Sequence, residues 1–222
     1  MALPIIILGG GGHAKVVIDA LLQQAREILG FCSLEQNARP LLGLKCLGGD
    51  EIVLAFGADR VRLANGIGAA GTIQSRRSIY ELFASQGYIF EKVLHPSAIT
   101  ASDVHLDAGV QIMAGAVVQP GTRIGSNSIV NTNASVDHDC WLGNHVHIAP
   151  GATLCGNVKV GNEAFIGAGA TVIQGKSIGA RSVIGAGAVV IEDIPADVTV
   201  VGVPAKVIHP KLTLPLNQIA ES

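Results

Sequence analysis

The second half of the chain carries a large aliphatic residue at every sixth position. This run begins at Leu106 and ends at Val190, and each of its fifteen members is Leu, Ile or Val. The residue two positions earlier is small in most cases, with Lys176 as the clear exception. Since alternate residues of an extended chain point to the same side, each group of six buries one aliphatic and one small side chain and then turns. A glycine often directly follows the aliphatic residue, as at Gly125 and Gly143, and we expect it to supply the turn.

Such a repeat predicts a solenoid. Three extended sides of six residues close a coil of 18 residues, and fifteen repeats make five stacked coils, each pairing only with its neighbours. The residues 191–208 break the period with two prolines and are expected to cap the last coil.

The first half has a different pattern. Residues 4–8 form an apolar run that ends at four glycines, and residues 13–25 have apolar side chains at helical spacing. This predicts a strand, a glycine turn and a helix, with further strands within 27–33 and 59–68. Residues 75–87 are expected to form a helix capped by Ser75 and ended by Gly87. The expected fold class is therefore a small Rossmann-like α/β domain followed by an all-β parallel helix.

We expect three segments: an α/β domain over 1–95, a β-helix with its cap over 96–208, and a tail over 209–222. The formal net charge of −2 offers no basic field for nucleic acid or an anionic membrane. No apolar run approaches the roughly 20 residues of a membrane span, and the first residues lack the basic region of a signal peptide. The four cysteines form no CxxC pair, which favours free thiols and a cytoplasmic protein.

Residues 136–150 contain three histidines and two aspartates. The six-residue period places His138 near a corner of the three-sided solenoid and His147 on the outer side of the solenoid. His138 could act as a general base, because a histidine pKa of about 6.5 suits proton transfer at neutral pH, with Asp139 or the equally near Asp137 orienting it. Two other interpretations stay open: a zinc site made with His145, or histidines that only fill a seam between subunits.

Other polar residues have a structural and a functional interpretation. The turn with Gly10 and Gly12 matches only part of a dinucleotide fingerprint, since Val16 stands near the place of its third glycine. It either gives room for a tight crossover or brings backbone N–H groups to a ligand phosphate or base. Lys206 either meets a phosphate of a bound cofactor or faces solvent. The Arg76 and Arg77 side chains are expected on a solvated helix face.

Three stretches resemble the NeuD/PglD-type bacterial sugar acetyltransferases. They are LGGGGHAKVV near the start, NTNASVDHDCWLGNHVHIAPGATLCGNVKVG in the repeats, and VVGVPAKVI near the end. The resemblance covers residues 3–208 and implies the left hand of the β-helix, acetyl-CoA as donor, and a homotrimer with active sites between neighbouring β-helices. It departs at Phe31-Cys32-Ser33, where the family often has adjacent acidic residues that hold the nucleotide. Glu35 is the nearest acid here, so recognition of the base and ribose is not carried over.

The resemblance also implies roles for single residues. Its catalytic pair corresponds to His138 and Asp139, and further active-site residues correspond to Asn131 and His147. The histidine of its glycine turn corresponds to His13, in the region that binds the acceptor. The remaining positions are those whose backbone lines its CoA groove: Gly156, Ala168 and Ala186.

Together these observations predict an acetyl-CoA-dependent N-acetyltransferase. Its expected acceptor is the amino group of a nucleotide-linked deoxyamino sugar, His138 is the expected base, and no metal is required. The alternative within the same class is O-acetylation of sialic acid or another sugar. Alternatives of other classes are a zinc hydratase of the trimeric β-helix type and a non-catalytic trimer that binds nucleotide sugars.

Overall fold

The computed structural model describes residues 2–35, 38–69 and 73–208. Its first part is a parallel sheet in the order β3-β2-β1-β4. The strands are β1 (Ile5–Leu8), β2 (Ile28–Cys32), β3 (Cys46–Gly48) and β4 (Arg62–Asn65), and the helices are α1 (Gly12–Gln23), the 3₁₀ helix η1 (Asp50–Ala55) and α2 (Gln74–Ser85).

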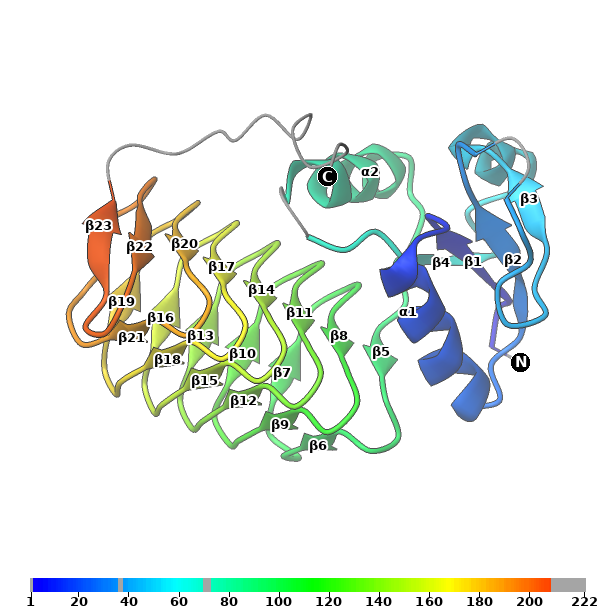
Figure 1. Ribbon diagram of the computed structural model, residues 1–222. Coiled ribbons are helices and arrows are strands. Elements are labelled where there is room, and N and C mark those ends of the chain that lie inside the picture. The colour runs from blue at the N-terminus through cyan, green and yellow to red at the C-terminus, as the bar shows by residue number, and fades with distance from the viewer. Residues whose placement is uncertain (1, 36–37, 70–72, 209–222) are drawn as a thin grey trace.

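The central strand β1 is buried on both faces, which explains its unbroken apolar sequence. Ile5 and Ile7 pack with residues of α1 on one face. Ile6 and Leu8 pack with Phe83 of α2 on the other face. The predicted α/β layer is therefore confirmed, with one helix on each side of the sheet (Figure 1).

The predicted strands and helices are confirmed with slightly different bounds, but one cap is wrong. Helix α2 begins at Gln74, one residue before the predicted Ser75 cap, and no side chain caps it. The predicted stop is confirmed, since Gly87 follows the helix with φ of +85°.

The second part is a triangular prism of short parallel strands (Figure 1). Strands 18 residues apart pair in register, as Ser135 pairs with Thr153. The fold class is that predicted, an α/β domain followed by a left-handed parallel β-helix.

The prism has three faces, named here by their strand number. The eight-stranded face holds β5 (Val93–Leu94), β8 (Gln111–Ile112), β11 (Ile129–Val130), β14 (His147–Ile148), β17 (Phe165–Ile166), β20 (Val183–Ile184), β22 (Thr199–Val201) and β23 (Lys206–Ile208). The six-stranded face holds β6 (Ile99–Thr100), β9 (Val117–Val118), β12 (Ser135–Val136), β15 (Thr153–Leu154), β18 (Thr171–Val172) and β21 (Val189–Val190). The five-stranded face holds β7 (His105–Leu106), β10 (Arg123–Ile124), β13 (Trp141–Leu142), β16 (Lys159–Val160) and β19 (Ser177–Ile178).

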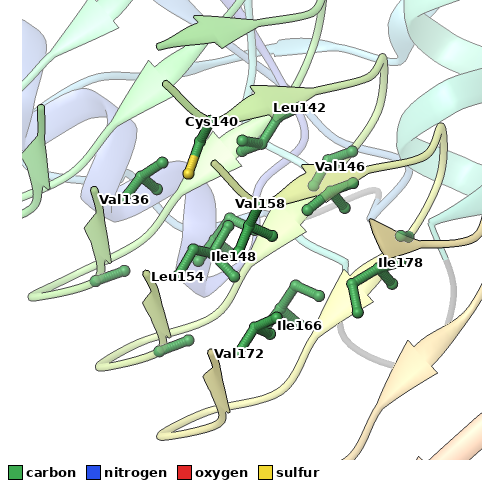
Figure 2. Packing of buried hydrophobic residues seen from close by; sticks show 14 of the residues in the cluster. Val136, Cys140, Leu142, Val146, Ile148, Leu154, Val158, Ile166, Val172 and Ile178 are labelled. Atoms are coloured by element: carbon green, nitrogen blue, oxygen red, sulfur yellow. The ribbon is translucent and has the colours of Figure 1, made fainter. Parts of the chain in front are cut away.

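The six-residue pattern describes the core of the prism correctly. The aliphatic residues of the repeat point inward and interdigitate, as Val136, Leu142 and Ile148 do in Figure 2. The small residues two positions earlier are buried with them, and Cys140 is among these. Every coil therefore adds the same apolar layer, and the core is continuous along the prism.

The glycines that directly follow the inward aliphatic residues do not supply the turn conformation, contrary to the prediction. The left-handed backbone lies three residues after each inward aliphatic, in every turn from Gly109 to Gly187. Glycine or asparagine occupies most of those positions, as their conformational preference requires. The glycines directly after the aliphatic instead give room to the next coil, because a Cβ on Gly161 would lie 2.6 Å from the Ala180 nitrogen.

The coils extend beyond the predicted repeat at both ends. Strands β5 and β6 already pair with β8 and β9, so the prism starts before Leu106. At the other end, β22 and β23 form an antiparallel pair that closes the last coil, as expected for the cap. The boundary between residues 95 and 96 stays a prediction, and the predicted tail 209–222 lies outside the described residues.

The α/β domain packs on the first coils of its own β-helix. The α1 residues Val17 and Ile18 share a buried cluster with Val93 and Ile129 of the eight-stranded face and with Met113, which follows β8. None of the helices in the described ranges is long and apolar enough to cross a membrane.

Candidate active site

The predicted base, His138, lies in the turn between β12 and β13, at the corner of the six- and five-stranded faces. Its Nδ1 is 2.8 Å from Oδ2 of Asp139, while its backbone N–H donates to Oδ1 of Asp137 at 2.8 Å. Asp139 has the left-handed φ of 58° found in the other turns. The structure thus pairs the imidazole with Asp139, the carboxylate that the family resemblance implies.

This pairing sets the protonation of His138. The hydrogen bond to Asp139, followed by the charge of Asp137, raises the pKa of His138 above its ordinary value, and partial desolvation opposes that shift. In the neutral ring, Asp139 holds the proton on Nδ1, so Nε2 carries the lone pair. The pair can therefore accept a proton at Nε2 and stabilise the resulting imidazolium.

A cavity of about 540 Å³ lies beside this ring. Its lining residues are Asp137, His138, Cys155, Gly156, Asn157, Gln174 and Gly175. The imidazole lies directly over Gly156, since a Cβ there would come within 2.5 Å of His138 Nε2. We call this space the His138 cavity.

A second group of candidates lies on the eight-stranded face, against the α/β domain. We call His13, Asn131 and His147 the His147 cluster. The His147 ring centroid is 5.1 Å from that of Phe165, and its Nε2 is 3.2 Å from Nδ2 of Asn131. His147 points away from the prism core, as predicted, but it is only 6% exposed. No neighbouring subunit is needed to bury it, because the chain's own α/β domain packs on that face.

The proton positions in the His147 cluster follow from its hydrogen bonds. Asn131 Oδ1 accepts from the Thr132 backbone N–H at 2.8 Å, so the amide presents its NH₂ group to His147. Burial, with the charges of His13 and Arg76, lowers the pKa of His147 to about 3. The neutral ring therefore accepts at Nε2 and carries its hydrogen on Nδ1, a buried atom without a hydrogen-bond partner in the described structure.

Arg76 does not line a solvated face, and that prediction is wrong. It is fully buried and donates to the carbonyl oxygens of Asn127 (3.1 Å), Asn65 (3.0 Å) and Ile67 (2.7 Å). Arg77 is partly exposed and pairs with Glu81 and Glu163. The two adjacent arginines of α2 therefore both attach the α/β domain to the β-helix.

His145 fills a seam, but the seam lies within the chain. Its Nδ1 is 3.0 Å from Nδ2 of Asn127, and its ring meets Tyr80 of α2 edge to face. His138 lies at another corner, so the three imidazoles of the zinc interpretation are not brought together in one chain. Across residues 2–35, 38–69 and 73–208, no three His, Cys, Asp or Glu side chains are grouped closely enough to hold a metal ion.

The glycine turn opens onto solvent. A cavity of about 310 Å³ is lined by Gly10, Gly11, Gly12, Lys15, Glu35, Ala38, Arg39 and Leu41. A Cβ on Gly10 would lie 3.1 Å from Phe31 and Ser33, so close packing at the ends of β1 and β2 already favours glycine there. At Gly12 an added Cβ would meet nothing within 4 Å, so packing does not explain that residue.

The candidates for the CoA groove are divided between corners. Gly156 lines the His138 cavity. Ala168 and Ala186 are exposed in turns between the eight- and six-stranded faces. Lys206 is exposed on β23, at the end of the eight-stranded face.

Sequence reasoning missed the residues that support the His147 cluster. Gln111, Asn65 and Asn127 are buried polar residues between the α/β domain and the β-helix. Outward positions of the repeat are variable, so Gln111 gave no signal. Arg76 did give one, because it lies on the same helical face as Tyr80 and Phe83, at spacings of four and seven.

Family models match both parts of the chain. A model of the PglD N-terminal domain matches residues 4–83. A model of the bacterial transferase hexapeptide (six repeats) matches residues 121–156 and 139–174, and a model of the hexapeptide repeat of succinyl-transferase matches residues 157–192.

Solved structures match nearly the whole chain. A histidine-to-asparagine mutant of perosamine N-acetyltransferase from Caulobacter crescentus, in complex with CoA and GDP-perosamine, is 37% identical with a TM-score of 0.88; the match covers 94% of this chain and 98% of that one. The acetyltransferase domain of PglB from Neisseria gonorrhoeae, in complex with acetyl coenzyme A, is 33% identical with a TM-score of 0.87, and the match covers 94% and 100%. WeeI from Acinetobacter baumannii is 26% identical with a TM-score of 0.83, and the match covers 93% and 100%.

Proposed function

Because this chain belongs to the NeuD/PglD-type sugar acetyltransferases with hexapeptide repeats, we propose that it acetylates a nucleotide-linked deoxyamino sugar. The donor is acetyl-CoA, and the acceptor is the amino group of the sugar. One observation carries the proposal: the His138–Asp139 pair presents a basic Nε2 at the edge of the His138 cavity.

His138 is the general base of this reaction. The amine attacks the thioester carbonyl, a C–N bond forms, and the C–S bond breaks with release of the thiolate. Nε2 of His138 accepts the proton that the amine loses, and the imidazolium then protonates the thiolate to give free CoA. Asp139 keeps the ring in the required tautomer and stabilises its charged form. Cys140 is buried with its pKa raised to about 11 by desolvation, so a direct transfer to the amine is favoured over an acyl-cysteine intermediate.

The other candidates hold the two substrates. The N–H of His147 Nδ1 donates to an oxygen of the acceptor or the thioester, and Asn131 fixes that ring. Gly10, Gly12 and His13 form the acceptor side. The CoA side comprises Gly156, Ala168, Ala186 and Lys206, through backbone groups and the lysine charge.

The active unit is a homotrimer, and we place it in the cytoplasm. The His138 cavity lies at one corner of the prism and the His147 cluster lies on its eight-stranded face, so we expect a complete site to need a second copy of the chain. Nothing in the proposed chemistry needs a metal.

The test is thiol release from acetyl-CoA with a panel of UDP-, GDP- and dTDP-linked amino sugars, with free sialic acid as comparison. We expect release with at least one amino sugar nucleotide, in the presence of a chelator, and a drop of roughly 10²–10⁴-fold in the His138→Asn variant. Near-full turnover in that variant would remove His138 from the mechanism.

The same panel separates the alternatives. Release with sialic acid but no amino sugar would identify an O-acetyltransferase. Binding of a nucleotide sugar without release would identify a binding protein, and activity lost on chelation would support the zinc interpretation.

A further inference from the structure

The buried guanidinium of Arg76 is the centre of a polar network between the two parts of the chain. It reaches the carbonyl oxygen of Asn65 at the end of β4, that of Ile67 two residues later, and that of Asn127 in the β-helix. The Asn65 amide returns two hydrogen bonds, to the Arg76 carbonyl at 2.9 Å and to Asn127 Oδ1 at 3.1 Å. This network fixes the end of β4 against the first coils.

The network continues from Arg76 to His13. The Asn65 carbonyl accepts from Arg76 Nη1 and also from Gln111 Nε2 at 2.7 Å. The other end of the Gln111 amide, Oε1, lies 2.8 Å from His13 Nε2. Gln111 is fully buried on β8, and its amide group connects the Asn65 carbonyl to His13.

This arrangement determines which nitrogen of His13 carries the proton. A carbonyl can only accept, so the Asn65 oxygen must face the Gln111 NH₂ group, and Gln111 Oε1 must face His13. His13 Nε2 must then donate. Burial, followed by the charge of Arg76, lowers the pKa of His13 to about 4, so the ring is neutral at pH 7 and its Nδ1 keeps the lone pair.

We infer that Arg76, Asn65 and Gln111 are positioning residues that hold His13 as a hydrogen-bond acceptor at Nδ1. The inference rests on the proposed function, which places His13 on the acceptor side of the site. His13 then accepts a hydrogen bond at Nδ1, whereas His147 donates one from its Nδ1–H. The structure thereby assigns to His13 a hydrogen-bond donor of the sugar as its partner, an amine or a hydroxyl.

The tautomer can be observed without any substrate. The full-length protein with ¹⁵N-labelled histidine is examined at pH 7 by long-range ¹H–¹⁵N correlation, and the signal of His13 is identified by its loss in His13→Asn. We expect an Nε2–H ring in the wild type. In Gln111→Met and in Arg76→Met, the two ring nitrogens of His13 should move toward averaged shifts, because the partner that selects the tautomer is lost or displaced.

Arg77→Met is the matched control. It removes the neighbouring arginine of α2 and its ion pairs with Glu81 and Glu163, but it leaves the network of Arg76, Asn65 and Gln111 intact. Its His13 signals should stay at the wild-type positions. An Nδ1–H ring in the wild type, or unchanged His13 signals in a folded Gln111→Met variant, would overturn the inference.

Kinetics distinguish this inference from the proposed function. With an active amino sugar nucleotide, Gln111→Met should raise the acceptor KM about tenfold, the effect of one lost hydrogen bond, and leave the acetyl-CoA KM unchanged. If no amino sugar nucleotide is acetylated but the tautomer is as expected, the proposed function fails and the positioning role of the network stands. If acetylation occurs but the His13 tautomer does not change in Gln111→Met, the positioning role alone fails.

Discussion

At the scale of single residues, we expect the charge of His138, the proposed base, to control the pH dependence of the reaction. A base works only when unprotonated, and the contacts with Asp139 and Asp137 raise the pKa of His138. Acidification should therefore protonate the base at a higher pH than for an ordinary histidine. We expect the acid limb of the kcat/KM profile above the reference value of about 6.5.

Replacing Asp139 by asparagine tests this assignment. The change removes the largest cause of the raised pKa, so the acid limb should move to lower pH. The plateau should fall by roughly 10²-fold, because the wrong tautomer of His138 is no longer disfavoured. Both quantities come from kcat/KM measured between pH 5 and pH 9.

Asp137→Asn is the companion variant. Asp137 acts on the imidazole through charge alone, while its carboxylate accepts the His138 backbone N–H. Its acid limb should also move to lower pH, but its plateau should stay near that of the wild type. A larger loss of plateau in Asp137→Asn than in Asp139→Asn would reverse the assignment of the two carboxylates.

At the scale of elements, the stacked turns at one corner of the prism place the His138 ring over the next coil. Gly156 follows one coil later at the same position of the repeat, and its missing Cβ makes room for the imidazole. In Gly156→Ala the ring must leave its place and its contact with Asp139. We expect kcat/KM to fall by roughly 10–10²-fold, a part of the contribution of a general base, while the melting temperature changes little because the displaced ring is exposed.

Gly151→Asn is the control for a glycine substitution in another turn of the β-helix. Gly151 has φ of +68° with open space around its Cα, and asparagine already occupies this position of the turn at Asn127 and Asn133. Activity and melting temperature should both stay close to those of the wild type. If Gly156→Ala behaves in the same way, the place of the ring over Gly156 does not matter for turnover.

The elements differ in how far the sequence predicts them. The β-helix is predictable because each inward position repeats one simple requirement, an aliphatic side chain in a narrow prism. The role of its glycines was not predictable from the local sequence, since Gly161 is needed only because of a neighbour 19 residues away. The burial of His147 depends on how the α/β domain docks on the coils, and no local pattern contains that docking; Arg76 differs, because its spacing from Tyr80 and Phe83 along the helix did indicate a buried face.

At the scale of the whole molecule, the candidate residues lie in two separate regions, the proposed half-sites. His138, Asp139 and Gly156 lie at one corner of the prism, and the His147 cluster lies on the eight-stranded face. The six-stranded face between them has small outward side chains on its middle strands, such as Ser135, Thr153 and Thr171. A flat face of this kind suits close packing of a second copy, which would bring its His147 cluster to the His138 cavity.

Mixed oligomers test this arrangement. The variants His138→Asn and His147→Asn should each be nearly inactive alone. If they are unfolded together in equal amounts and refolded, a site between subunits takes His138 from one chain and His147 from another. Random assembly then leaves about one quarter of the sites with both histidines, so about 25% of wild-type activity should return.

A second mixture shows whether the recovery depends on separate half-sites. His138→Asn and Asp139→Asn alter the same corner of the same chain, so every site in their mixed oligomers lacks one member of the pair. Refolding this mixture should give no more activity than Asp139→Asn alone supplies. Recovery in the first mixture but not in the second requires that the base and His147 act from different chains. Equal activity in both mixtures would mean that each chain carries its own complete site, and the half-sites would then have to meet through a movement of the α/β domain.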